Sequence, residues 1–394
     1  MPPFISKAMI MAAAAGGGID ESIPAGASAT FNSNFYANDG YTVSCDPNNA
    51  NKFVVVYRDY SNSSKGTACV GTISDTSISF GSEYVFNTGY TYEPSVAFDP
   101  NNSGKFVVVY KDSGNSEYGT ACVGTVSGTT ITYGSEYVFN SGVSDPIGNI
   151  AFDPNDSGKF VVVYRDRGNS SYGTAIVGTV SGTAISYGTA VVYNTAETNY
   201  TYVAFDPNTS GKFVVTYRDD GNSDYGTACV GTVSGTSISF GSEYVFNSGA
   251  SGYNKIDFDP NDSDKFVVAY RDGGNSNYGT AIVGTISGTA ISYGSEYVFN
   301  SSDQHYFGVA CDPNNSGKFI VAYKDYGNPY YGTVIVGTVS GTTITYGSEY
   351  TFDGSDHNFM SVAFESNSSG KFVVVYRDAT DSGKGKAILG QIGT

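Results

Sequence analysis

A unit of about 53 residues is repeated along most of this chain, and this period constrains the fold more than any other feature of the sequence. One clear copy, residues 153–205, reads DPNDSGKFVVVYRDRGNSSYGTAIVGTVSGTAISYGTAVVYNTAETNYTYVAF. Its opening acidic residue recurs at Asp46, Asp99, Asp206, Asp259, Asp312 and Glu365, in steps of 53 or 54 residues. A period in this range is typical of a propeller or a solenoid.

The content of the unit favours the propeller. It holds four segments rich in Val, Ile, Tyr, Phe and Thr and bounded by Gly, Asn and Pro: 159–166, 173–180, 184–193 and 202–205. These are predicted as the second, third and fourth strands of one blade and the first strand of the next. Seven copies therefore predict an all-β fold, a seven-bladed β-propeller of four-stranded antiparallel blades.

Substitutions between the copies agree with tight hairpins. In the turn between the first and second strands, five copies have Gly where Asn51 and Asp264 stand in the others. The turn between the third and fourth strands likewise has Gly where the first copy has Asp75. Asn and Asp tolerate a positive φ better than other non-glycine residues, so both turns are predicted to need one. A glycine also recurs in the third strand, where we expect close packing between neighbouring blades: Gly71, Gly124, Gly178, Gly231, Gly284, Gly337 and Gly390.

The repeat begins and ends out of phase. Residues 28–32 align with the end of a fourth strand, whereas the chain stops just after the third strand of the seventh copy. We therefore expect residues 27–32 to pair beside residues 386–392, which closes the ring and covers two strand edges. This divides the chain into a propeller over residues 26–394 and a short N-terminal extension over residues 1–25.

The extension has an apolar patch at residues 8–15, preceded by Lys7 and followed by three glycines. It is too short and interrupted for a transmembrane helix. Two interpretations stay open: a retained anchor or docking peptide, or a leader that is disordered or cleaved as a signal.

The net charge and the positions of the cysteines indicate which classes of partner and cofactor this protein is not expected to bind. A formal net charge of −17 disfavours nucleic acid and membrane insertion. The cysteines stand where other copies carry Ile or Phe, which predicts small, buried, reduced side chains: Cys45, Cys69, Cys122, Cys229 and Cys311. Neither a disulfide framework nor a metal-ligand spacing is present, so we predict no cofactor, no metal and folding in a reducing cytoplasm.

Two resemblances follow from the repeated phrases. The turn at residues 112–116, Asp-Ser-Gly-Asn-Ser, resembles the Asp-box of sialidase-type propellers, Ser-x-Asp-x-Gly-x-Thr-Trp, in which it is structural; here Trp is missing and the aromatic is Tyr118. Phrases such as GTVSGTSISFGSEYVFNSG resemble the tandem repeats of marine bacteriophage virion proteins, often tail-fibre or adhesin-like, over residues 26–394. That resemblance implies a location on the virion, as a tail-fibre, head-fibre or decoration protein, and docking to other virion proteins through the N-terminal segment.

Differences between the copies indicate where recognition occurs. The segment joining each fourth strand to the next first strand varies most, and variable loops commonly carry binding. From these segments we predict ligand-binding residues on one face: Tyr200, Tyr253, His305, Tyr306, His357 and Phe359. The Arg-Asp or Lys-Asp pair at the end of every second strand is interpreted as structural. The two histidines, each near an Asp, leave a metal or acid–base site as a less favoured interpretation.

The resulting prediction is a non-enzymatic bacteriophage virion protein that presents a propeller to a host cell-surface glycan or protein. A homo-oligomer held together by the anchor is compatible with this prediction. A secreted or cell-surface bacterial lectin or adhesin is the first alternative and requires export through residues 1–25. A sialidase-like glycosidase is the second, and would need an asymmetric cluster of arginines and acids on one face.

Overall fold

The computed structural model describes residues 26–33, 40–145, 150–367 and 370–393, and these are built from β-strands and single-turn 3-10 helices. The strands are β1 (Ala29–Asn32), β2 (Thr42–Cys45), β3 (Lys52–Asp59), β4 (Lys65–Ser74), β5 (Ser77–Phe98), β6 (Lys105–Asp112), β7 (Tyr118–Ser127), β8 (Thr130–Asp145), β9 (Ile150–Phe152), β10 (Lys159–Asp166), β11 (Tyr172–Ser181), β12 (Ala184–Tyr187), β13 (Val191–Phe205), β14 (Lys212–Asp219), β15 (Tyr225–Ser234), β16 (Ser237–Phe258), β17 (Lys265–Asp272), β18 (Tyr278–Ser287), β19 (Ala290–Asp303), β20 (Phe307–Cys311), β21 (Lys318–Asp325), β22 (Tyr331–Ser340), β23 (Thr343–Tyr346), β24 (Tyr350–Asp353), β25 (His357–Phe364), β26 (Lys371–Asp378) and β27 (Lys384–Gln391). The 3-10 helices are η1 (Tyr60–Asn62), η2 (Ser113–Asn115), η3 (Arg167–Asn169), η4 (Asp220–Asn222) and η5 (Gly273–Asn275). Residues 1–25, the predicted extension, lie outside the described ranges.

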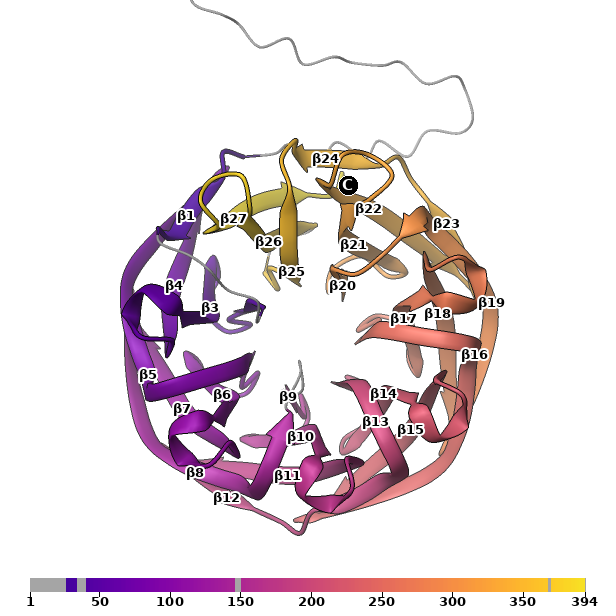
Figure 1. Cartoon of the computed structure of the whole chain (residues 1–394), viewed down its shortest axis with the longest axis horizontal. Helices are drawn as coiled ribbons and strands as arrows, with labels where there is room; N and C mark the ends of the chain where they lie inside the picture. The colour runs from indigo at the N-terminus through magenta and orange to yellow at the C-terminus, as the bar shows by residue number, and fades with distance from the viewer. Residues whose placement is uncertain (1–25, 34–39, 146–149, 368–369, 394) are drawn as a thin grey trace, which may run out of the picture.

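Strands of one repeat pair in chain order as an antiparallel sheet. For example, β9 pairs with β10, β10 with β11, and β11 with β12. The repeats follow one another around a ring, with their first strands nearest its centre (Figure 1). The predicted all-β architecture of antiparallel strands is confirmed.

The connection from a fourth strand to the next first strand is largely extended backbone rather than a loop. In β5, residues 77–90 pair with β4, and residues 91–98 pair with β6 of the next repeat. β13 and β16 likewise serve two sheets. The variable segments are therefore held at both ends by backbone hydrogen bonds.

Hydrophobic clusters lie between neighbouring repeats, and the second strand contributes to two of them. Val54 and Val56 point into a cluster shared with Val108 of the next repeat. Val55 and Tyr57 point the opposite way, into another cluster. All five side chains are fully buried, which confirms that the second strand is apolar on both faces.

The two ends of the repeat array meet. β1 pairs antiparallel with β27, with Ala29 opposite Ala387 and Thr30 opposite Lys386, so the predicted pairing is confirmed over a shorter stretch. Phe31 lies in a cluster that combines side chains of the first and last repeats, such as Tyr57 and Val373. The first and last repeats thus share a core as other neighbours do.

A belt of hydrogen bonds also links consecutive repeats at their first turns. Asn48 Nδ2 donates to the carbonyl of Pro100 at 2.8 Å in the next repeat. The same bond runs from Asn367 of the last repeat to Pro47 of the first, at 3.4 Å. The opening acid acts similarly: Asp46 Oδ2 accepts from the backbone N–H of Gly104 at 3.1 Å. Its recurrence in the sequence is therefore explained by contact between repeats.

The expected turn conformations are present. Asn51, Asp75 and Asp264 have φ of 65°, 50° and 63°. The cysteines are all free and buried, as predicted.

The third-strand glycine corrects one expectation, because it packs within its own repeat rather than between repeats. A Cβ on Gly71 would lie 2.0 Å from Cζ of Phe53, the residue directly opposite on the paired strand. The glycine leaves room for that ring to lie flat across the sheet.

Candidate functional site

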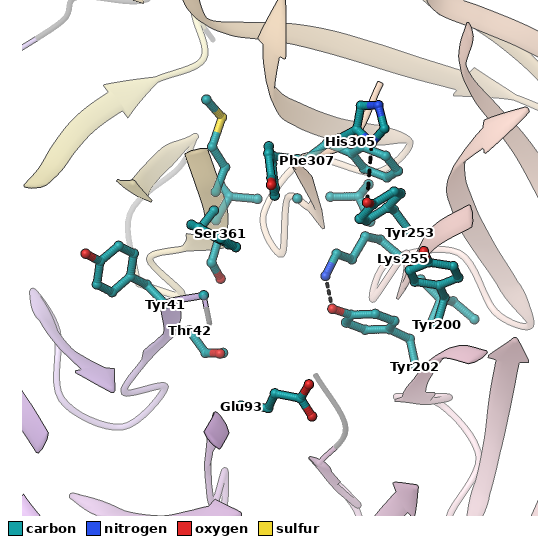
Figure 2. Close-up of a pocket in the computed structure, with 18 of the residues that line it drawn as sticks. Tyr41, Thr42, Glu93, Tyr200, Tyr202, Tyr253, Lys255, His305, Phe307 and Ser361 are labelled. Atoms are coloured by element: carbon teal, nitrogen blue, oxygen red, sulfur yellow. Dashed lines mark hydrogen bonds between the residues drawn. The ribbon is translucent and has the colours of Figure 1, made fainter. Parts of the chain in front are cut away.

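A cavity of about 340 Å³ lies at the centre of the ring, lined mainly by the first strands of several repeats. Tyr200, Tyr202 and Tyr253 line one side, and Tyr41 and Thr42 line the other (Figure 2). The centre is where the first strands converge, so residues far apart in the sequence meet there.

Three of the lining aromatics sit at β-bulges. Tyr200, Tyr253 and Phe359 have φ of 50°, 56° and 54°, and the strand register shifts at each of them. A positive φ is an outlier for a bulky side chain and costs on the order of 1–3 kcal/mol. Each bulge directs an aromatic ring toward the cavity. The residues with a strained backbone are therefore also residues that line the cavity.

The structure brings five of the six predicted residues together. The rings of Tyr200 and Tyr253 are 4.8 Å apart, and those of Tyr306 and Phe359 are also 4.8 Å apart. His305 Nδ1 lies 3.3 Å from the hydroxyl oxygen of Tyr253. All five line the central cavity and are partly exposed to it.

Burial and the neighbouring Tyr200 and Tyr306 raise the pKa of Tyr253 to about 12. Its hydroxyl therefore stays protonated at neutral pH. The Tyr253 side chain offers a ligand an apolar ring with a polar tip.

His357 is the exception, because its side chain is fully buried rather than on the binding face. Its ring centroid lies 4.7 Å from that of Tyr376, and its Nε2 is 3.2 Å from Asp353 Oδ2. His357 pairs with Asp378 in the strand register, as Thr91 pairs with Asp112 in an earlier repeat.

The reason for this error is strand parity. His305 and His357 do not occupy equivalent positions: Gln304, one residue before His305, is the buried counterpart of His357. Successive side chains of an extended segment point to opposite faces, so one residue of offset separates a cavity residue from an interior one.

Lys255 also lines the cavity and is not among the binding residues that the sequence predicted. Its ammonium lies 3.7 Å from the centroid of the Tyr202 ring and hydrogen-bonds the Tyr202 hydroxyl (Figure 2). Burial lowers the pKa of Lys255 to about 7. Among the described residues, no carboxylate forms an ion pair with it.

The missed signal is a difference between copies at one position. Counting back from the end of the first strand, other repeats carry Thr42, Ser95, Tyr202, Gly308 and Ser361 where Lys255 stands. Lys255 is thus a cation at a position that is neutral in those repeats.

Asp257, two residues further along the same strand, has a structural role. Its Oδ2 accepts from the backbone N–H of Cys311 at 2.8 Å, and its Oδ1 accepts from that of Phe258 at 3.0 Å. Burial raises the pKa of this carboxyl to about 6, against the effect of these hydrogen bonds. Asp257 ties two repeats together and is not among the residues that line the cavity.

The repeated Asp at the second-strand end is held in a backbone turn. Asp112 Oδ1 accepts from the N–H of Gly114 at 2.9 Å and from Asn87 Nδ2 of the preceding repeat at 3.1 Å. The bond from Asn to Asp recurs between Asn140 and Asp166. These contacts support the structural interpretation of the repeated Arg-Asp and Lys-Asp pairs. Within the described ranges, no group of three or more His, Cys, Asp or Glu side chains is placed to hold a metal ion.

Comparison with known proteins adds information on the fold. No protein-family profile and no curated protein matches the sequence. Among solved structures, Sqt1 from Chaetomium thermophilum is similar with a TM-score of 0.54 and 12% identity, covering 89% of this chain and 85% of that one. Sqt1 from Saccharomyces cerevisiae is similar with a TM-score of 0.54 and 8% identity, covering 93% and 98%.

A structure described as NanB plus Optactamide is similar with a TM-score of 0.51 and 9% identity, covering 92% of this chain and 70% of that one. These likenesses support a propeller-like all-β fold. At such low identity they carry no information on activity. No helix in the described part of the chain has the length and apolar character needed to cross a membrane.

Proposed function

We propose that this chain is a seven-bladed β-propeller that binds a glycan in its central cavity without transforming it. Seven repeats, the antiparallel pairing within them and the contact between the first and last repeats support the blade count. In this arrangement β1 is the fourth strand of the last blade.

The observation that carries the binding proposal is the convergence of variable residues on one cavity. Tyr200, Tyr253, His305, Tyr306 and Phe359 come from four different repeats and meet there, although each was predicted from the variability and the side-chain type of its own segment. Aromatic walls with hydroxyl tips provide rigid contact area and hydrogen bonds, which suit a sugar ring. The cavity is at the small end of ligand sites, roughly 300–1,000 Å³. A protein surface would leave such a concave site poorly filled.

The small number of carboxylate side chains in the described cavity lining supports binding without catalysis. Glycoside hydrolysis ordinarily uses two carboxylic side chains on either side of the scissile bond. Among the described lining residues only Glu93 carries a carboxylate. A sialidase-like glycosidase, which uses a tyrosine nucleophile instead of a carboxylate pair, would need a cluster of arginines and acids on one face. The described lining has no arginine and one carboxylate, so this is the weaker candidate.

We further propose that the protein belongs to a bacteriophage virion and meets a host surface glycan, docked to other virion proteins through residues 1–25. The resemblance of its repeats to those of phage virion proteins supports this location. Detection of its peptides in purified particles, including peptides from the first 25 residues, would support it. Detection only in bacterial culture medium would favour the secreted lectin instead.

The binding proposal is tested with a glycan array and three forms of the protein. The double variant Tyr253→Ala/Tyr306→Ala should lose binding, because it removes two walls of the cavity. The control Tyr90→Ala removes an aromatic ring that is 38% exposed and lies outside the cavity lining, and it should bind as wild type does. Unchanged binding by the double variant would refute the site.

A further inference from the structure

Lys255 places a charged side chain at one point of the cavity wall, where the equivalent residues of the other repeats named above are neutral. The equivalent first-strand positions named above are neutral, and the described cavity lining contains one lysine and no arginine. The protein as a whole carries a formal charge of −17, so Lys255 is not part of a general basic surface.

The contacts of Lys255 leave its charge uncompensated. The ammonium is bonded to a neutral phenol and lies over that phenol ring, with no ion pair to a carboxylate in the described part of the chain. Holding an ammonium away from bulk water without a counter-charge is unfavourable, and burial accordingly lowers the pKa of Lys255 to about 7. An anion placed beside it would supply the missing counter-charge and keep the amine protonated.

The other ionisable groups limit where an anion can lie. Glu93 also lines the cavity and lies below Tyr202 and Lys255 in the view of Figure 2. His305 also lines the cavity, and its Nε2 lies 3.3 Å from Asp303 Oδ2. The Asp257 carboxylate accepts hydrogen bonds from backbone N–H groups. An acidic ligand would therefore orient with its charged group toward Lys255 and its hydroxyls toward Glu93.

We propose that the cavity binds an acidic sugar unit, with a carboxylate or sulfate oxygen accepting a charge-assisted hydrogen bond from Lys255 Nζ. This inference rests on the proposed glycan-binding function and deepens it by naming the ligand class. Tyr202 contacts the ammonium, and Tyr200 and Tyr253 line the same side of the cavity; together they supply the wall against which the sugar ring packs (Figure 2). Specificity for the acid arises because a neutral sugar leaves the partly buried cation without a counter-charge.

The test uses matched pairs of oligosaccharides that differ only in the acid group: a galacturonate oligomer against the galactose oligomer, and a 6-sulfated against an unsulfated galactoside. Affinities are measured by calorimetry at pH 6, where Lys255 is charged. Wild type should prefer the acidic member of at least one pair by about tenfold or more. The preferred pair distinguishes carboxylate from sulfate.

Two variants locate the preference. Lys255→Met keeps an unbranched side chain, one atom shorter, and removes its charge. It should lower the acid preference to about one while binding of the neutral member persists. Lys255→Arg keeps the charge and should retain a preference. Because neutral side chains occupy the equivalent position in other repeats, Lys255→Met is expected to fold, which circular dichroism would verify.

Each outcome decides the matter. Equal wild-type affinity for both members of both pairs would overturn the acidic-ligand inference and leave the glycan-binding function standing. A preference unchanged in Lys255→Met would overturn the role of Lys255. Absence of binding to all four sugars and to the glycan array would overturn both proposals.

Discussion

Phe31→Ala tests how the ring is held closed. Phe31 anchors β1, a strand of four residues that pairs with β27 of the last repeat. Its side chain is 6% exposed, and its ring centroid lies 5.2 to 5.5 Å from those of Tyr41, Tyr57 and Phe80. Removing the ring leaves a cavity in the core shared by the first and last repeats.

The expected loss of unfolding free energy is about 3–5 kcal/mol, the usual range for truncating a buried Phe to Ala. Phe246→Ala is the matched control. Phe246 is 5% exposed and covers Gly226 as Phe31 covers Gly385: a Cβ on either glycine would lie 2.4 or 2.5 Å from the phenylalanine Cε2. The direct cost should therefore be similar in both variants.

The two variants should differ in which strand is released from its sheet. Phe246 lies within β16, which continues through the neighbouring sheet, whereas β1 is short and has lost its main side-chain contact. Phe31→Ala should release β1, expose the edge of β27 and promote association between molecules. Urea unfolding, native-state proteolysis near residues 26–33 and light scattering measure these effects. Equal protease resistance and a monomeric state in both variants would refute the role of β1 as the closing strand.

Three further predictions follow from single contacts. Lys255→Met should raise the unfolding free energy below pH 7 by about 4–5 kcal/mol, because charging a lysine whose folded-state pKa is lowered to about 7 destabilises the folded protein. The gain should vanish as pH rises toward about 10.4, and a pH-independent difference in urea unfolding would contradict it. Gly71→Ala should lower the melting temperature, because its Cβ would lie 2.0 Å from the Phe53 ring; calorimetry showing an unchanged transition would be inconsistent with that packing. Cys122→Ile should lower the unfolding free energy by less than about 1.5 kcal/mol in chemical denaturation, because other repeats carry Ile at this position. In the native wild-type protein the Cys122 thiol should resist labelling, and rapid labelling would argue against its burial.

Features that depend on residues close in the chain were predictable. The turn conformations at Asn51, Asp75 and Asp264 were predicted because repeated copies show which residues replace Gly, and Asn and Asp are the ones that tolerate positive φ. The burial of the cysteines followed from the same comparison. The pairing of β1 with β27 was predictable because an out-of-phase repeat leaves one strand missing at one end and one spare at the other.

The candidate site was predicted only in part. Selecting the variable segments identified five aromatic or imidazole side chains that line one cavity, yet His357 was included wrongly and Lys255 was overlooked. The error at His357 concerns which way a side chain points within an extended segment, whereas the signal for Lys255, a cation where other copies are neutral, was present in the sequence. A bulge shifts the alternation of faces by one residue, and no local sequence signal marks it clearly when Tyr or Phe occupies the positive-φ position.

The sequence by itself determined the repeat, the strand order, the turn types and the position of the closing strand, because these depend on short-range patterns that seven copies display repeatedly. Only the tertiary structure decided which residues meet at the centre, how the third-strand glycine is used, and that Lys255 stands without an opposing carboxylate in the described part of the chain. The physical reason is that the cavity forms where first strands from different repeats converge. Its composition and charge are therefore set by side chains such as Tyr253 and His305, or Tyr202 and Lys255, which lie 52 and 53 residues apart in the chain and in contact in the ring.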